Sequence, residues 1–341
     1  MSTSTQIFPT LATIQTLLVT YAYPTMLVLG ILGNSINIYI FLRKKLVGTS
    51  CNNYFLATAI TNLIILNIGI ISFLYTYYQS WAITTIYCQM RTYFFHASQQ
   101  MSRYFLVMAC FDRFALCSTH ACLRKFSHIR IARLYVIPGT IIFWLIVPIH
   151  IPIFYYSINN TCTFSGVAAF YQRAYNLVVT AFLPPGLMLI FSILTFRNLK
   201  LRNQRRQIYP ITPRNFTIFM RKTRQEQIKN QQIFVMLLIQ VFIYLCSTSL
   251  YSIYTLYTFI TANDGTNKSN ERLSIESFIS FTNTMLIYVF PFISFYLFVS
   301  VSHTFRKEMK LMIIRIVNQC HTFSINNGNH HAENTINVMY Q

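Results

Sequence analysis

Residues 174–196 read AYNLVVTAFLPPGLMLIFSILTF, and not one of them is charged. A bilayer core about 30 Å thick is crossed by a helix of roughly 20 apolar residues. This stretch is therefore long enough to cross a membrane once. It predicts a membrane-spanning helix, and the same criterion can be applied outward along the chain.

Further charge-free stretches lie on both sides of this one. They cover residues 1–42, 46–90, 134–172, 230–263 and 277–305, and between Thr92 and Phe111 the only charged residue is Arg103. The stretches 46–90 and 134–172 are each long enough for one span and a short turn. We therefore expect an all-α membrane protein, a seven-transmembrane helix bundle. Its helices should lie near residues 14–42, 53–77, 88–112, 131–154, 174–198, 231–260 and 275–302.

Composition agrees with this class. Of the 341 residues, 54% are hydrophobic and only 10% are charged, whereas about a quarter of a soluble domain is charged. The net charge of +20 raises the possibility of nucleic-acid binding, because basic chains often bind phosphates. Nearly all of the basic residues lie between or after the apolar stretches, so we expect a lipid bilayer and no nucleic acid as the partner.

The basic residues also predict the orientation. Most of the 27 Lys and Arg residues fall within 43–45, 113–133, 197–229 and 306–315, which are alternate loops and the segment after the last helix. Lys and Arg concentrate on the cytoplasmic side of membrane proteins. We expect a multi-pass plasma-membrane protein with its N-terminus extracellular and its C-terminus cytoplasmic. No basic segment precedes the first helix, so no cleaved signal peptide is expected.

The expected organisation has four parts. Residues 1–13 form an extracellular tail, and residues 14–302 form the membrane domain. Residues 303–317 predict a short amphipathic surface helix, which would lie on the inner membrane surface with its cations near anionic lipid. Residues 318–341 are polar and are expected to be a disordered cytoplasmic tail.

The outer loops carry two kinds of marker. Asn159 and Asn267 begin glycosylation sequons, and both fall in loops that the charge pattern assigns to the outside. Of the eight cysteines, only Cys88 and Cys162 reach that oxidising side, whereas the others lie in the membrane or at the cytosolic face.

A set of motifs follows the same frame. Cys88 opens the third helix and Asp112-Arg113-Phe114 closes it, and the 25 residues from Cys88 to Arg113 span about 37 Å in a helix. The other motifs, in chain order, are Gly33-Asn34, Trp144, Pro184-Pro185 and Phe305-Arg306. Over about residues 14 to 317 the chain resembles the rhodopsin-like (class A) G-protein-coupled receptors.

The resemblance implies roles for particular residues. It pairs Cys88 with Cys162 in a disulfide, and it makes Arg113 the residue that couples the bundle to a heterotrimeric G protein. Asp112 would restrain Arg113 at rest, and Phe114 completes the triplet that faces the G protein. The implied partners are that G protein and an extracellular ligand. We find no metal-ligand cluster, phosphate loop or paired carboxylates in the sequence, so we expect no enzyme, metal or cofactor.

The sequence departs from the family pattern at three places. Asn62 stands where the second helix usually carries Asp, which should weaken sodium binding in the bundle. Residues 245–250 read LCSTSL where the family has Cys-Trp-x-Pro, so the usual kink of the sixth helix is not expected. Residues 294–298 read SFYLF in place of Asn-Pro-x-x-Tyr.

Four residues are expected to form a polar core: Asn34, Asn62, Arg103 and Ser294. A charge at mid-helix costs about 3 kcal/mol on insertion scales, so Arg103 must face the bundle interior and find a partner. The neighbouring spans offer it no acid. Asn62, Asn67 and backbone carbonyls remain open as partners.

The ligand site is predicted at the outer end of the third helix, from Arg91, Phe95, His96 and Gln99, with Glu276 opposite. None of these helix-three residues is an acid that could hold an amine, so a peptide is the expected ligand, as in FMRFamide-type neuropeptide receptors. The alternative is that His96 and Gln99 only satisfy each other and neighbouring helices.

Two other functions stay open. The altered motifs of the sixth and seventh helices suggest a chemosensory receptor or a decoy receptor that signals poorly. A membrane transporter or channel is the alternative from another class, although the sequence shows no internal repeat of the kind common in transporters.

Overall fold

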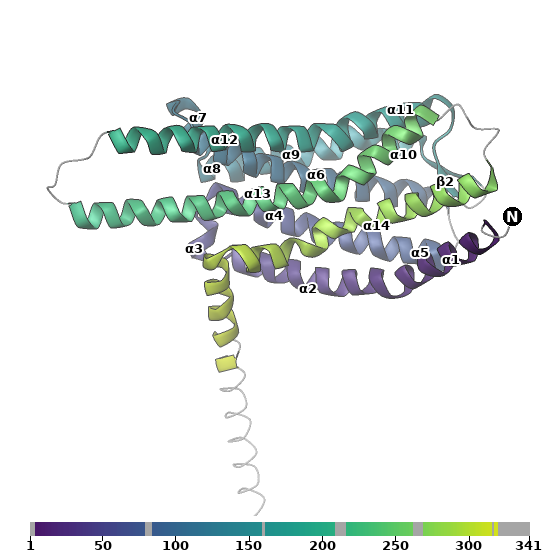
Figure 1. Ribbon diagram of the computed structural model, residues 1–341, viewed down its shortest axis with the longest axis horizontal. Helices are drawn as coiled ribbons and strands as arrows, with labels where there is room; N and C mark the ends of the chain where they lie inside the picture. The colour runs from purple at the N-terminus through teal and green to yellow at the C-terminus, as the bar shows by residue number, and fades with distance from the viewer. Residues whose placement is uncertain are drawn as a thin grey trace, which may run out of the picture.

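The computed structural model of the protein describes residues 4–78, 84–158, 161–208, 216–261, 269–315 and 317–319. Its long helical segments lie side by side along the long axis of the molecule (Figure 1). Six helices in the described residues are long and apolar enough to cross a membrane: Thr10–Phe41, Ser50–Tyr78, Ile129–Phe154, Gly166–Leu201, Gln232–Ile260 and Glu271–Val301. With α6 (Thr85–Cys117) they form the expected all-α bundle.

Several spans consist of consecutive helical segments with wider π-type turns between them and, in the fourth span, also a tighter 3₁₀ turn at Val147–Ile149. The first contains α1 (Ser4–Leu17) and α2 (Tyr23–Phe41), and the second contains α4 (Ser50–Ile65) and α5 (Ser72–Tyr78). The fourth contains α8 (Ile129–Ile131), α9 (Ile137–Ile146) and α10 (His150–Phe154), and the fifth contains α11 (Gly166–Tyr175) and α12 (Leu183–Ile208). The last two are α13 (Phe216–Ile260) and α14 (Asn270–Val301).

The ends of the bundle carry short elements. One end has α3 (Lys44–Val47) and α7 (Ala121–Phe126), and the other has the antiparallel pair β1 (Tyr156–Ile158) and β2 (Thr161–Thr163) (Figure 1). We name the α3–α7 end the inner end and the β1–β2 end the outer end, after the orientation that the basic residues predict.

The helix α6 is not among the six most apolar helices because its middle is polar. Gln99, Gln100, Ser102 and Arg103 are all buried there. The helix contacts α4, α9, α10, α12 and α13, so these side chains meet other helices rather than lipid. The side chain of Thr84 caps its start by accepting a hydrogen bond from the backbone N–H of Tyr87.

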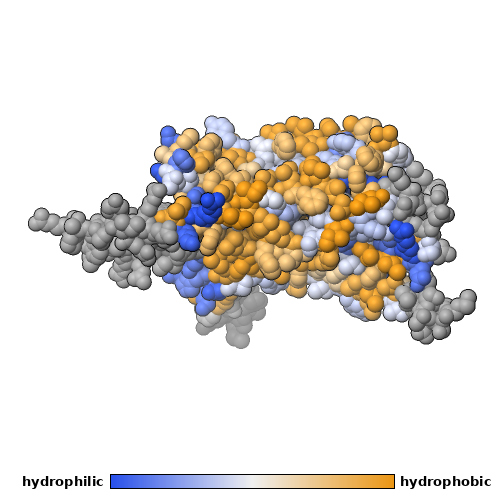
Figure 2. Space-filling model, turned by 45° about the horizontal axis from the view of Figure 1, so that its top comes forward, coloured by the Kyte–Doolittle hydropathy of each residue, from blue (hydrophilic) through white to orange (hydrophobic). Residues whose placement is uncertain are grey.

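The outer surface of the bundle has the polarity of a membrane protein. In Figure 2, hydrophobic residues cover the middle of the visible face, and hydrophilic residues gather near its two ends. Large apolar side chains such as Leu134, Ile146 and Phe242 are exposed on the surface of the bundle. A soluble protein rarely exposes a continuous apolar surface of this extent.

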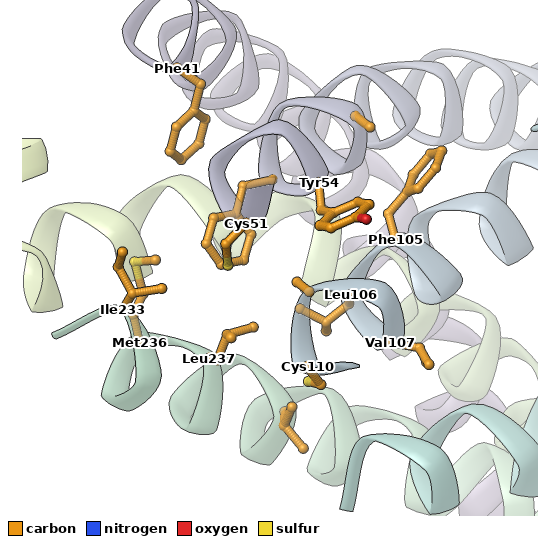
Figure 3. Packing of buried hydrophobic residues seen from close by; sticks show 14 of the residues in the cluster. Phe41, Cys51, Tyr54, Phe105, Leu106, Val107, Cys110, Ile233, Met236 and Leu237 are labelled. Carbon is orange, nitrogen blue, oxygen red and sulfur yellow. The ribbon is translucent and has the colours of Figure 1, made fainter. Parts of the chain in front are cut away.

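Two apolar clusters fill the interior. The inner one contains residues of all seven spans, and Figure 3 shows Cys51 of α4, Leu106 of α6 and Leu237 of α13 within it. The outer one contains Tyr23 and Tyr288, whose rings meet edge-on with centroids 5.9 Å apart. Close packing of this kind fixes the positions of the polar side chains on the same helices.

The fifth and sixth helices are longer than the sequence predicted. The fifth helix was expected to end at residue 198 and the sixth to begin at residue 231. In the structure α12 continues to Ile208 and α13 begins at Phe216. The prediction was wrong in treating residues 199–230 as a loop. Arg, Lys, Gln and Glu are good helix formers, and a polar segment beyond the membrane can continue a helix. Two prolines that would interrupt a continuous helix in this segment, Pro210 and Pro213, lie outside the described residues.

Residues 303–315 form a helix that leaves the inner end of the bundle at a steep angle to α14 (Figure 1). Phe305 anchors it, since its ring is buried against Phe41 and Phe298. Arg306 Nη1 donates to two carbonyl oxygens in the last turn of α14, which lack helical partners. Ile313 is exposed, and the placement of this helix on a membrane surface stays a prediction.

Candidate functional site

The inner end of α6 carries a buried ion pair. Arg113 Nη2 donates to Asp112 Oδ2 at 2.7 Å, and the two residues are only 5% and 2% exposed. The second carboxylate oxygen of Asp112 accepts a 2.8 Å hydrogen bond from Ser127 Oγ. Arg113 Nε is buried without a partner in the described structure. The carboxylate is therefore held from two sides, and it anchors the guanidinium.

Ser127 also ties this pair to the second helix. Ser50 Oγ at the start of α4 donates to the Ser127 carbonyl at 2.7 Å. Close by, Arg133 Nε donates to Asn53 Oδ1 at 2.8 Å. The third member of the motif, Phe114, has its ring centroid 6.0 Å from that of Phe191 of α12, so it packs against the fifth helix.

A second polar cluster lies in the middle of the bundle and joins four helices. Asn34 Nδ2 donates to the carbonyl of Pro291 at 2.9 Å, and Ser294 Oγ donates to Asn34 Oδ1 at 3.1 Å. Asn62 Nδ2 lies 3.4 Å from Asn34 Oδ1, and Asn62 Oδ1 accepts from Ser102 Oγ at 2.8 Å. The structure thus brings together Asn34, Asn62 and Ser294, and adds Ser102.

Arg103 does not join that cluster. Its Nη2 donates to Gln99 Oε1 at 3.2 Å and its Nη1 to Gln100 Oε1 at 3.4 Å. Asn62 and Asn67, the side chains considered from sequence, are bonded elsewhere. The partners lie three and four residues earlier on the same helix, where α-helical spacing makes side chains neighbours; that spacing could have identified them.

The outer end holds the disulfide. Cys88 at the start of α6 is joined to Cys162 of β2, with Cα atoms 5.6 Å apart. Tyr155 OH donates to the Cys162 carbonyl at 3.1 Å. Burial raises the pKa of Tyr155 above its ordinary value, which keeps this donor protonated. The two sequon asparagines, Asn159 and Asn267, lie outside the described residues.

The predicted ligand residues occupy separate places at this end. Arg91 Nη1 donates to Thr76 Oγ1 at 3.1 Å, and its guanidinium lies 5.9 Å from the centre of the Tyr87 ring. It lines a groove of about 480 Å³ between α5 and α6. Phe95 turns to the outer apolar cluster, with its ring 5.8 Å from that of Tyr288. Gln99 binds Arg103, as described above.

His96 faces the fifth helix. Its Nε2 lies 3.2 Å from Tyr175 OH and 3.4 Å from Gln100 Nε2. Gln100 in turn donates to Thr180 Oγ1 at 2.6 Å. Sequence reasoning missed Gln100 as the residue that links His96, Arg103 and the fifth helix.

Glu276 is on the opposite side of the bundle and already has partners. It accepts from Tyr257 OH at 2.6 Å and from Arg272 Nε at 2.9 Å. These three residues line a cavity of about 820 Å³ between α13 and α14. Glu276 therefore belongs to a different cavity from Arg91.

These features define a membrane protein of seven packed helices, with a buried acid–arginine pair at one end and a disulfide at the other. Residues 33–309 match the model of the family described as 7 transmembrane receptor (rhodopsin family). This match covers well over half of the chain, and the protein belongs to that family. No curated protein matches the sequence.

Proposed function

We propose that the protein converts binding of an extracellular ligand into activation of a heterotrimeric G protein at the plasma membrane. The observation that carries the proposal is the buried pair of Asp112 and Arg113 at the inner end of α6. Family membership favours this receptor function over a transporter or channel.

The pair can act as a restraint on Arg113. Hydrogen bonds to charged groups contribute about 1.5–3 kcal/mol, and here both partners are nearly withdrawn from solvent. Suppose that the ion pair forms only in the resting receptor and stabilises it by about 2 kcal/mol. Loss of the pair then shifts the equilibrium between the resting and active forms roughly thirtyfold toward the active form. A ligand needs a comparable difference in affinity between the two forms.

The test uses two variants and two matched controls. Asp112→Asn keeps the shape and removes the charge, so ligand-independent signalling should rise. Arg113→Ala should abolish signalling at unchanged surface expression. Glu271→Gln and Arg173→Ala make the same chemical changes at the outer end and should leave basal signalling as in the wild type. Normal signalling by Arg113→Ala would overturn the proposed mechanism.

Ser127→Ala tests the restraint on Arg113 with a smaller change to the structure. It removes one neutral donor from Asp112 and leaves the ion pair in place. Basal signalling should rise less than in Asp112→Asn. A panel of G-protein sensors, normalised to surface expression, measures both effects.

A signalling-impaired receptor is the second candidate, and one feature favours it. No proline occurs in α13 over Phe216–Ile260, so this helix lacks the kink that the family uses to move it. α14 does contain a proline, at Pro291. If neither the wild type nor Asp112→Asn signals through any sensor while ligand binds, the decoy function is the better description.

We propose a peptide as the ligand, because the outer half of α6 carries no acid to pair with an amine. A peptide library applied to expressing cells can identify it. Phe95→Ala, His96→Leu and Glu276→Gln should then each weaken binding. Because Glu276 and Arg91 line different cavities, unchanged affinity in Glu276→Gln with a loss in His96→Leu would place the ligand on the side of α6.

A further inference from the structure

The middle of the bundle contains a buried cation that has no described counter-charge. Arg103 is 7% exposed, and its bonds run to two neutral amide oxygens. The described carboxylates lie elsewhere: Asp112, Glu276 and Glu308 pair with Arg113, Arg272 and Arg43, and Glu271 is exposed at the start of α14. A buried charge is strongly disfavoured unless an opposite charge accompanies it.

A small cavity lies against Arg103. Its volume is about 20 Å³, and it is bounded by α6, α13 and α14 with Ile65 of α4. That volume holds one water-sized species. The apolar part of its wall includes Ile65 and Phe290, and the polar part includes Arg103, Gln99 and Tyr244.

Several hydrogen-bond donors of this wall are unused. A guanidinium has five N–H groups, and two of those of Arg103 are bonded. Because Gln99 turns its oxygen to Arg103, its Nε2 points elsewhere, and this atom is buried without a partner. Tyr244 OH is also buried without a partner. These two residues are 6% and 3% exposed.

The other polar side chains of the wall already use their hydroxyl protons in hydrogen bonds. Ser247 Oγ and Thr248 Oγ1 both donate to the carbonyl of Tyr244, and Ser102 Oγ donates to Asn62. No unpartnered buried side-chain atom among the described lining residues is an obligate acceptor. A species that only accepts hydrogen bonds and carries negative charge fits this wall.

We propose that the cavity is a binding site for a small monovalent anion, chloride under physiological conditions, held by Arg103, Gln99 Nε2 and Tyr244 OH. A water molecule would leave the cation uncompensated. The positive charge of Arg103 repels a metal cation and excludes it from this cavity. Gluconate and phosphate exceed the volume, and the apolar wall favours a weakly hydrated halide.

The first experiment measures thermal unfolding of the purified receptor in detergent at constant ionic strength, with sodium chloride replaced stepwise by sodium gluconate. Binding to the folded state alone raises the melting temperature in a saturable way. Bromide should replace chloride. Exchange of sodium for choline should have no effect, whereas a shift that follows the cation would overturn the proposal.

Variants then locate the site. Arg103→Met removes the charge and should abolish the halide dependence; it should be at least as stable as the wild type in gluconate, because an apolar residue often replaces a buried charge without loss. Arg173→Met, which changes a cation of α11 near the outer end, should keep the full shift. Tyr244→Phe should weaken halide affinity by about tenfold or more, since a hydrogen bond to a charged group is lost.

Two further outcomes contradict the proposal: a wild-type melting temperature independent of chloride, or an equal chloride shift in Arg103→Met. Neither depends on ligand identity or G-protein coupling, so this inference can fail while the proposed function holds. Anomalous diffraction from a bromide-grown crystal would show the ion beside Arg103 directly.

Discussion

Replacing Gly69 with alanine should destabilise the outer half of the bundle. A Cβ atom at this position would lie 2.4 Å from Phe95 Cε2 and 2.5 Å from Tyr288 Cε1, whereas ordinary contacts are 3.4–4 Å. Tyr288 is fully buried and packs edge-on against Tyr23, so its ring has little room to move. The second helix therefore needs glycine where it approaches the third and seventh.

The magnitude follows from two opposing effects. Overpacking a dense interior costs about 1–3 kcal/mol, and exchanging glycine for alanine in a helix gains up to about 1 kcal/mol. Gly186→Ala supplies the matched control, because a Cβ atom there meets nothing within 4 Å. The gain from replacing glycine with alanine in a helix is common to both variants. Their difference in unfolding free energy should therefore be about 1–3 kcal/mol, which is the cost of the steric overlap at Gly69.

Thermal unfolding in detergent measures this difference. A thiol-reactive dye reports it, because Cys51 and Cys110 are buried free cysteines that become accessible on unfolding. Gly139→Ala is a second control, since its Cβ also meets nothing within 4 Å. If Gly69→Ala melts at or above the temperature of the two controls, the packing of Phe95 and Tyr288 on the second helix is refuted.

Two further outcomes are expected. Replacing Cys88 or Cys162 with serine opens a link between residues 74 apart and should cost about 4 kcal/mol in the chain-entropy model; peptide mapping of surface receptor that finds both thiols free would contradict the disulfide. Glu308→Gln removes the carboxylate 3.5 Å from Arg43 Nε, and amide hydrogen exchange over residues 303–315 should become faster, whereas unchanged exchange would show that this carboxylate does not hold the helix.

The parts of the fold that the sequence predicted are those set by single, strong constraints. Spans follow from the length of charge-free stretches, because a bilayer tolerates few exposed charges. Asn34, Asn62 and Ser294 were predicted together from their place in the family frame, and the structure brings them together. Each of these features depends on how far along a helix a residue lies, and residue numbers give that distance directly.

The contacts that the sequence missed depend on loops and on rotation about a helix axis. Ser127 follows Asp112 by fifteen residues through a turn whose path no periodicity reveals. The five candidate ligand residues were grouped because all lie near the outer end of the bundle. In the structure, however, Arg91 contacts α5 and Glu276 contacts α13. Depth alone cannot tell which neighbour a side chain meets, and packing of the whole bundle decides it.

Tyr244 belongs both to the proposed anion site and to the sixth helix, so it predicts how halide binding affects the position of that helix. Tyr244 of α13 lines the cavity, and its ring meets that of Phe290 of α14 edge-on at 5.8 Å. An outward movement of α13 would withdraw this donor from Arg103 and weaken halide binding, so by linkage a bound halide favours the inward position of the helix. Replacing chloride by gluconate should therefore raise basal signalling of the wild type and leave Arg103→Met unchanged. Equal responses of the two receptors would show that the cavity is not linked to the movement of α13.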